Sequence, residues 1–303
     1  MLKNTVLDCF GPKMKQILSN NDWKSINEIR LRIGKPMILK SGAAEFYADE
    51  CGIKTENEAL SYKPDAKDIE EMLNMISDYS LYSVQEQLRY GFITVQGGHR
   101  AAFAGRVVTE NNKITTIKNI GSAALRIAEE KIGCGKEAVK YVCEDGIKNT
   151  LIVSPVCGGK TTMLRDIIRI LSNDGITVGL ADERGELAAC YMGVAQLDVG
   201  KRTDVIDSCP KAYALSMLIR TMSPDLICAD EIGSEEDFRA LSQACLCGSA
   251  VICTAHGGSI DDVLKRCEMN GAENIFERYI LLEGRKAPGK IIGVFNKKGE
   301  RLC

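Results

Sequence analysis

The sequence lacks an excess of charge of either sign. Lys and Arg together number 39 and Asp and Glu 41, which leaves a formal net charge of −2. A dedicated nucleic-acid-binding protein usually carries an overall basic field, so we do not expect nucleic acid as a partner, although a local basic surface is compatible with this balance. The composition also excludes a disordered or fibrous chain, because 45% of the residues are hydrophobic and 26% are charged.

Long apolar runs are absent as well. No stretch of this sequence approaches the roughly 18 apolar residues that a membrane-spanning helix needs. Gly11, Pro12 and Lys13 interrupt the N-terminal segment where a signal peptide would need a continuous apolar region. We therefore expect a cytoplasmic protein without a transmembrane segment of its own.

Cysteine is abundant, but paired cysteine motifs are missing. The chain has 13 cysteines and no Cys-x-x-Cys pair, and Cys245 and Cys247 are separated by one residue within a helical pattern. This distribution argues against zinc ribbons and small disulfide scaffolds, and an odd number of cysteines suits a reducing compartment. We expect most of them to be small buried apolar residues.

The chain is longer than a single hydrophobic core usually requires, and its texture changes near residue 130. We expect two domains within the 303 residues, 1–130 and 131–303. The first part mixes helical patterns with alternating strands, which predicts a small α+β domain with an antiparallel sheet.

Three helical segments are expected in the first part. One covers 3–19 with a break at Gly11-Pro12, one is capped by Asp65 and has Ile69, Met72, Leu73 and Ile76 on one face, and a short one contains Leu81, Val84 and Leu88. The expected strands of this part are 28–33, 37–39, 92–95, 100–108 and 114–117, with turns at Gly97-Gly98 and Asn111-Asn112.

The second part alternates apolar strands with amphipathic helices. Strands are expected at 150–153, 176–181, 226–229 and 250–255, and helices at 161–172, 211–222 and 235–247. Apolar strands that do not alternate with polar residues and are separated by helices indicate a parallel sheet covered on both faces. Residues 279–282 and 291–295 are expected to form a closing hairpin.

A partial phosphate-binding loop lies between the first strand and the first helix of this second part. Gly159-Lys160-Thr161 matches the latter half of the pattern G-x-x-x-x-G-K-[ST], but Ser154 stands at the first Gly. In such a loop the backbone N–H groups surround the phosphates, the Lys reaches the β and γ groups, and the Thr hydroxyl faces Mg²⁺. The alternative is a chance Gly-Gly-Lys-Thr turn before a helix; the flanking strand and helix favour the phosphate loop. The expected nucleotide-binding residues are Ser154, Pro155, Val156, Cys157, Gly158, Gly159, Lys160, Thr161 and Thr162.

Three further strands end in polar residues. Asp230-Glu231 follows 226–229, Asp182-Glu183 ends 176–181, and Thr254 and His256 end 250–255. Ligands bind to open parallel sheets at the carboxyl ends of the strands. There Asp230 could hold Mg²⁺ and Glu231 could orient or deprotonate an attacking water. Taken alone, Asp230-Glu231 is more simply a solvated acidic turn, but its place about seventy residues after the phosphate loop favours the functional interpretation. Thr254 or His256 could either sense a γ-phosphate or only cap the following segment.

These blocks together resemble the ATPases of bacterial type II and type IV secretion and pilus systems, a family of P-loop NTPases, and most closely its sporulation members. The matching stretches are 28–36, 97–100 and 104–107 in the first part, and 182–184, 207–211, 219–224, 230–233 and 255–257 in the second. They span nearly the whole chain. The family usually has Gly-Pro-Pro where this chain has Ser154-Pro155-Val156, a difference that bears on affinity and rate more than on identity.

The resemblance implies a RecA-like ATPase domain, Mg²⁺-dependent ATP hydrolysis, and hexameric rings that act from the cytoplasm on a membrane-embedded assembly. For a sporulation member, that assembly is a transenvelope channel between mother cell and forespore, with membrane-embedded channel proteins on the mother-cell side as partners. The implied catalytic residues are Glu231, Glu183, His256 and Arg220. The implied metal-binding residues are Thr161, Asp230 and Asp182, and the arginines implied to face nucleotide are Arg100, Arg106 and Arg126.

Two alternatives to this function stay open. Some relatives of the family bind single-stranded nucleic acid, so the chain could be a nucleic-acid-dependent ATPase despite its slightly acidic charge. Ser154 also permits a nucleotide-binding scaffold with little turnover.

Overall fold

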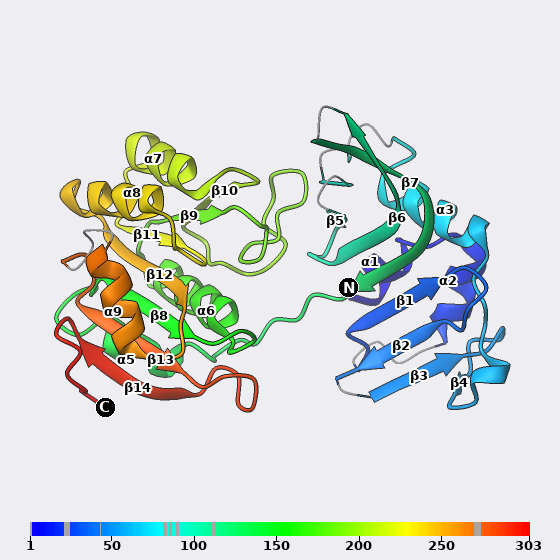
Figure 1. Cartoon of the computed structure of the whole chain (residues 1–303), viewed down its shortest axis with the longest axis horizontal. Coiled ribbons are helices and arrows are strands. Elements are labelled where there is room, and N and C mark those ends of the chain that lie inside the picture. The colour runs from blue at the N-terminus through cyan, green and yellow to red at the C-terminus, as the bar shows by residue number, and fades with distance from the viewer. Residues whose placement is uncertain are drawn as a thin grey trace. The chain divides into compact units, whose positions relative to one another are not determined.

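The computed structural model describes residues 2–20, 25–42, 44–80, 84, 87–88, 91–110, 113–269 and 274–303. The chain divides into two compact units, Met1–Glu129 and Glu130–Cys303, which are described one at a time (Figure 1). The fold is mixed α/β, with one seven-stranded sheet in each unit.

The first unit is an antiparallel sheet with the strand order β4-β3-β2-β1-β7-β6-β5. Its strands are β1 (Glu28–Arg32), β2 (Ile38–Ser41), β3 (Ala44–Ala48), β4 (Lys54–Thr55), β5 (Phe92–Thr94), β6 (Arg100–Glu110) and β7 (Lys113–Arg126). The helices are α1 (Leu2–Leu7), α2 (Pro12–Ser19) and α3 (Ala66–Ile76), with a 3₁₀ turn at Glu58–Leu60. The expected antiparallel sheet is confirmed.

Alternation along the strands decides which face of this sheet is buried. Ile29 and Leu31 of β1 lie in one core with Leu125 of β7, Met14 of α2 and Met72 of α3. Because successive side chains of a strand point to opposite faces, the charged residues between these positions lie on the other face.

Local signals in the sequence set several helix boundaries of the first unit. The predicted break at Gly11-Pro12 is confirmed, because Pro12 is the first residue of α2. Asp65 caps α3 as expected, and Asp68 completes a reciprocal capping box. The predicted helix around Leu81 and Leu88 and the turn at Asn111-Asn112 lie largely or wholly outside the described residues.

β6 and β7 form a longer ribbon than the sequence pattern predicts. The pairing of β6 with β7 shifts register between Ala104 and Arg106. Gly105 allows this bulge, since a Cβ there would lie 2.6 Å from the Lys118 carbonyl oxygen. Asn119 has a φ of 48° opposite the bulge. This irregularity interrupts the alternation, and for that reason the pattern predicted only residues 114–117 of β7.

The second unit is a mostly parallel sheet with the order β10-β9-β11-β12-β8-β13-β14. Its strands are β8 (Thr150–Ser154), β9 (Val178–Asp182), β10 (Thr203–Asp207), β11 (Leu226–Ala229), β12 (Ala250–His256), β13 (Arg278–Leu282) and β14 (Ile291–Asn296). Its helices are α5 (Lys136–Val142), α6 (Lys160–Asn173), α7 (Lys211–Met222), α8 (Glu235–Leu246) and α9 (Ile260–Met269). The predicted hairpin is β13 and β14, but β13 also pairs in parallel with β8 and so extends the sheet.

Apolar cores lie on both faces of this sheet, as the uninterrupted apolar strands predict. Leu215 of α7 and Phe238 of α8 belong to one core, and Met163 and Leu164 of α6 belong to the other. The strand register places the carboxyl ends of five strands, β8 to β12, side by side, because Asp207 pairs with Asp182, Ala229 with both Ala181 and Cys253, and His256 with Ser154. All the polar strand ends noted above therefore meet along this side of the sheet.

Candidate functional site

The loop between β8 and α6 connects a buried strand to the N-terminus of a helix, as the predicted phosphate loop requires. β8 is buried throughout and ends at Ser154, and α6 begins at Lys160. Gly159 has a φ of 86° and Cys157 a φ of 62°, both in the left-handed region. Ser154 is not among the residues with positive φ, so the backbone at the position of the missing Gly accommodates an L side chain.

Two glycines leave no space for side chains within this loop. A Cβ at Gly158 would lie 2.3 Å from Ser154 Oγ, and a Cβ at Gly159 would lie 2.8 Å from the Gly289 nitrogen. Gly289, in the turn between β13 and β14, donates an N–H bond of 2.8 Å to the Gly158 carbonyl. The C-terminal hairpin therefore supports the loop, a role that no sequence pattern indicated.

Ser154 anchors the start of the loop. It is fully buried, and its hydroxyl donates to the Pro155 carbonyl over 2.8 Å. Its own carbonyl accepts from Gly257 N–H at 3.1 Å and from Lys160 Nζ at 3.4 Å. An ammonium has three donors. The described residues provide an acceptor for one of those of Lys160, so two are available to a ligand.

Asp230 joins the phosphate loop to the neighbouring strands. Thr161 Oγ1 donates to Asp230 Oδ2 over 2.6 Å, and Thr254 Oγ1 donates to the other oxygen, Oδ1. The pKa of Asp230 is raised above its ordinary value, chiefly because the carboxyl is buried. The hydrogen bonds from Thr161 and Thr254 lower this pKa, and the nearby charges of Glu186 and Glu231 raise it further.

Glu231 points its carboxylate away from this buried network. Its backbone N–H donates to Thr254 Oγ1 over 2.8 Å. The φ angle of Glu231 is 51°, in the left-handed region. Its side chain is 44% exposed and forms an ion pair of 3.0 Å with Arg184. The carboxylate of Glu231 is thus exposed while that of the preceding Asp230 is buried, and its catalytic role stays a prediction.

Asp182, a predicted metal ligand, is bonded to the backbone of its own loop. Oδ1 accepts from the N–H groups of Glu186 at 2.8 Å and Leu187 at 3.1 Å, and Oδ2 accepts from Ala188 at 2.8 Å. Arg165 of α6 fixes the same loop by donating to the carbonyls of Glu186 and Leu187. Oδ1 of Asp182 thus accepts two backbone bonds and Oδ2 accepts one, and metal ligation by this residue stays a prediction.

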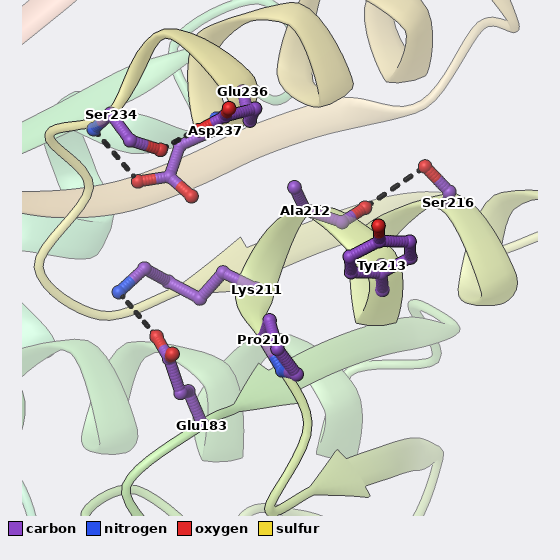
Figure 2. Close-up of a pocket in the computed structure, with 9 residues that line it drawn as sticks. All are labelled: Glu183, Pro210, Lys211, Ala212, Tyr213, Ser216, Ser234, Glu236 and Asp237. Atoms are coloured by element: carbon purple, nitrogen blue, oxygen red, sulfur yellow. Dashed lines mark hydrogen bonds and ion pairs between the residues drawn. The ribbon is translucent and has the colours of Figure 1, made fainter. Parts of the chain in front are cut away.

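Glu183 lies between two hollows at the edge of the sheet. Its carboxylate forms an ion pair of 2.9 Å with Lys211, the first residue of α7 (Figure 2). The larger hollow, of about 580 Å³, is lined by Glu183, Pro210, Lys211, Ala212, Tyr213, Ser216, Ser234, Glu236 and Asp237. The smaller one is lined by Ala181, Asp182, Glu183, Arg184, Glu186, Lys211, Asp230 and Glu231. The Lys211–Glu183 ion pair thus lines both hollows. No pattern in the sequence indicated that Lys211 contacts Glu183.

The remaining predicted residues of the second unit differ in their distance from the loop. His256 is exposed at the end of β12, and its Cα pairs with that of Ser154. Arg220 lies in the last turn of α7, about 14 Å along the helix axis from Lys211 at 1.5 Å per residue. Because α7 leads into the start of β11, Arg220 lies toward the side of the sheet where the parallel strands begin, away from their carboxyl ends. The structure therefore brings His256, but not Arg220, to the phosphate loop of the same chain.

The three predicted arginines of the first unit lie on β6 and β7. Arg100 and Arg126 are cross-strand partners, and Arg106 follows the bulge. Arg126 Nε lies 3.4 Å from Glu28 Oε2, and the Arg100 guanidinium lies 4.9 Å from the centre of the Phe92 ring. Contact of these arginines with nucleotide stays a prediction.

The donors at the edge of the sheet fit a magnesium nucleotide. Thr161 and Asp230 supply the hard oxygen ligands that Mg²⁺ prefers, and Mg²⁺ is usually held by one or two carboxylates together with phosphates and water. No group of three or more His, Cys, Asp or Glu side chains suited to a metal occurs in the described part of the chain. The residues therefore fit a metal that arrives with phosphate rather than a closed protein cage.

A search of the described helices found none that is both long enough and apolar enough to cross a membrane.

Comparisons with known proteins identify a family and a fold. The family described as "Sporulation stage III, protein AA" matches residues 2–302. "Stage III sporulation protein AA" of Bacillus subtilis (strain 168) is 38% identical over 309 residues, which cover 99% of this chain and 97% of that protein.

Two solved structures resemble the present one at low identity. The Legionella pneumophila ATPase DotB has a TM-score of 0.58 and 15% identity, with 88% of this chain and 75% of that chain covered. The pilus retraction motor PilT with bound ADP has a TM-score of 0.55 and 17% identity, with 84% and 74% covered. The chain shares the fold of these secretion and pilus ATPases.

Proposed function

Because the chain belongs to the family of sporulation stage III protein AA, we propose that it is a Mg²⁺-dependent ATPase of sporulation. It hydrolyses ATP to power assembly of, or transport through, a channel between mother cell and forespore. The observation that carries the hydrolytic part is the contact between Thr161 of the phosphate loop and Asp230 at the end of β11.

The loop residues bind the phosphates in this proposal. The backbone N–H groups around Gly158 and Gly159 surround the phosphate oxygens, with the N-terminus of α6 behind them. Lys160 neutralises the terminal phosphates, and Thr161 and Asp230 hold Mg²⁺. When bound, Mg²⁺ neutralises the charge that develops on the phosphate oxygens during transfer.

Glu231 is the general base of the proposed reaction. Its carboxylate accepts a proton from the attacking water as the water oxygen bonds to the γ-phosphorus; the bond between this phosphorus and the β–γ bridging oxygen breaks, and ADP and inorganic phosphate leave. Glu231 has an exposed carboxylate, in contrast with Asp230, whose two oxygens both accept hydroxyl bonds. The two adjacent acids thus have different functions, metal binding for Asp230 and proton transfer for Glu231.

The motor acts as a ring of chains on the cytoplasmic side of the channel. The fold shared with the ATPase DotB and the pilus retraction motor PilT supports a motor role, and the ring is what the resemblance to the secretion ATPases implies. Family membership supports the place in sporulation. In a ring, Arg100, Arg106, Arg126 and Arg220 can act on the nucleotide of a neighbouring chain, so ATP turnover per chain rises with protein concentration.

The test is ATP turnover by the purified full chain, measured together with molar mass in the presence and absence of Mg·ATP. Lys160→Ala removes the phosphate-binding cation and abolishes ATP binding and turnover. Glu231→Gln keeps binding and loses turnover. Lys140→Ala, which changes an exposed lysine of α5 in the same unit, is the matched control and behaves as the wild type.

Two results would contradict the proposal. Full turnover in Lys160→Ala refutes the site. ATP binding without turnover in the wild type makes the chain a nucleotide-binding scaffold. For the biological role, cells whose own copy carries Lys160→Ala form far fewer heat-resistant spores than cells with Lys140→Ala.

A further inference from the structure

Thr254 contacts three consecutive residues that follow β11. It lies near the end of β12 and is fully buried. Its hydroxyl donates to Asp230 Oδ1 and accepts the N–H of Glu231 at 2.8 Å. Its carbonyl accepts the N–H of Ile232 at 2.9 Å. One residue therefore contacts the carboxylate of Asp230 and the backbone of the next two residues.

The hydroxyl of Thr254 makes both side-chain contacts with a single atom. A threonine hydroxyl has one donor and two acceptor sites. The donor is used on Asp230 and an acceptor on Glu231 N–H. Threonine is also β-branched, which suits a buried strand and restricts its χ1 angle. Valine at this position would keep the shape and lose both bonds.

The backbone that Thr254 holds is strained. Glu231 has a φ of 51°, although it carries a side chain. For a residue other than Gly this conformation costs about 1–2 kcal/mol, and it persists only where the surrounding structure enforces it. The bonds from Thr254 to Glu231 and Ile232 are such an enforcement, because they fix the N–H groups on both sides of the Glu231 Cα.

Asp230 receives hydroxyl bonds from two sides. Thr161 of the phosphate loop donates to Oδ2 and Thr254 donates to Oδ1. The Thr254 bond therefore determines how the carboxylate is rotated and which oxygen faces Thr161. A carboxylate held by one bond alone would turn about its χ2 angle, which is a soft torsion.

We propose that Thr254 is a positioning residue that orients Asp230 toward the phosphate loop and holds Glu231 in its left-handed conformation. This inference rests on the proposed ATPase function. Thr254 is fully buried, so it acts through the two acids. Its role differs from that of His256, which is exposed two residues later on the same strand.

The experiment compares Thr254→Val with Thr254→Ser in the full chain. We measure the affinity for ATP with and without Mg²⁺, and separately kcat and KM for ATP turnover. Thr254→Val is expected to lower two quantities by about 10- to 100-fold: the gain in ATP affinity that Mg²⁺ provides, and kcat. This is the usual range for residues that orient metal ligands. ATP affinity without Mg²⁺ is unchanged, because the phosphate loop is intact. Thr254→Ser, which keeps the hydroxyl, restores both.

Thr150→Val is the matched control. Thr150 is also a fully buried threonine, but it begins β8 at the opposite end of the adjacent strand, where its hydroxyl donates to the Lys148 carbonyl. Thr150→Val removes a buried hydroxyl, as Thr254→Val does, but we expect it to leave the Mg²⁺-dependent gain in ATP affinity unchanged. If Thr254→Val does not fold, Thr254→Cys provides a residue of similar size with a much weaker donor.

The outcomes separate this inference from the proposed function. If Thr254→Val and Thr150→Val have the same Mg²⁺-dependent gain in ATP affinity as the wild type, the positioning role is wrong. If Thr254→Ser is as defective as Thr254→Val, the hydroxyl is not the cause and the inference also fails. If the wild type binds Mg·ATP without hydrolysing it, the proposed function fails, but the binding measurement still decides the role of Thr254.

Discussion

Thr161 and Asp230 are 69 residues apart in the chain, and their side chains meet at 2.6 Å. One belongs to the first turn of α6 and the other follows β11. β12 lies between β8 and β11 in the sheet, so the contact crosses one intervening strand. The loop after β8 and the acidic segment after β11 thus meet at one candidate site.

Asp230→Asn is expected to abolish the gain in ATP affinity that Mg²⁺ provides, while ATP affinity without Mg²⁺ changes little. Asparagine keeps the size of the side chain and removes its charge, and hard cations prefer charged oxygens. Calorimetric titration of ATP with and without Mg²⁺ measures the difference. Asp225→Asn is the control, because Asp225 precedes the same strand at its other end and accepts the N–H of Thr177. Equal Mg²⁺ dependence in both variants would contradict the assignment of Asp230.

Lys211→Ala is expected to lower kcat with little loss of stability. It removes the partner of Glu183, an implied catalytic residue. The Glu183 side chain is 39% exposed and that of Lys211 13%, so solvent screens the pair only in part, and we expect it to contribute about 1 kcal/mol to the free energy of unfolding. If the lysine acts through Glu183, adding Glu183→Gln to Lys211→Ala lowers kcat no further. Arg239→Ala, which breaks the exposed pair with Glu235 on α8, is the control. Additive losses of kcat in the double variant would show that the two residues act independently.

Gly159→Ala is expected to destabilise the second unit by about 1–3 kcal/mol and to weaken ATP binding. Its φ is 86°, and the new Cβ would lie 2.8 Å from a backbone nitrogen of the C-terminal hairpin. Cys157→Ala is the matched control, because Cys157 has a φ of 62° and already carries a Cβ. Chemical denaturation and ATP titration of both variants test this comparison. The packing argument fails if both alanine variants bind ATP equally well.

Stability of the first unit is expected to fall as the pH decreases from 6.5 toward 4. His99 is fully buried; its Nδ1 accepts the N–H of Ala128, and its Nε2 lies 3.0 Å from Thr5 Oγ1. Burial lowers the pKa of His99 from 6.5 to about 4. In this pH window the unfolded chain binds a proton that the folded chain does not, so stability rises with pH. The pKa difference predicts a loss of about 2 kcal/mol by pH 5 relative to neutral pH.

Urea unfolding at pH 7.5 and pH 5 measures this loss. His99→Gln removes the titrating group, so the variant should be less stable than the wild type at pH 7.5 and should lose less stability on acidification. The same loss in both chains would assign the pH dependence to other groups.

Local patterns predicted the elements that carry the site. The apolar run at 150–153 followed by Gly159-Lys160-Thr161 indicated a strand, a phosphate loop and a helix; the strand and the helix are β8 and α6, and phosphate binding by the loop between them stays a prediction. Asp65 indicated the start of α3 because helix capping involves residues three positions apart. Such signals are readable because the interacting groups are close in sequence.

Contacts between distant segments were not predictable in this way. Gly289 supports the phosphate loop, and Thr254 holds the acids after β11, yet neither contact leaves a periodic signal. β10, at the edge of the sheet, is only partly buried and so lacks the apolar run that identified the other parallel strands. Arg220 lies toward the side of the sheet where the parallel strands begin because α7 runs antiparallel to the strands, which becomes clear only when the helix is placed on the sheet.

The sequence by itself determined the α/β fold class, the phosphate loop and the polar residues at the strand ends, because these depend on hydrophobic periodicity and short-range backbone chemistry. Only the tertiary structure decided how the acidic residues at the strand ends differ in burial and hydrogen bonding. The register of β9, β11 and β12 buries Asp230 between two hydroxyls, bonds Asp182 to the backbone and leaves the carboxylate of Glu231 exposed. The physical reason is that burial and hydrogen bonding, which distinguish one carboxylate from another, arise from neighbours on other strands.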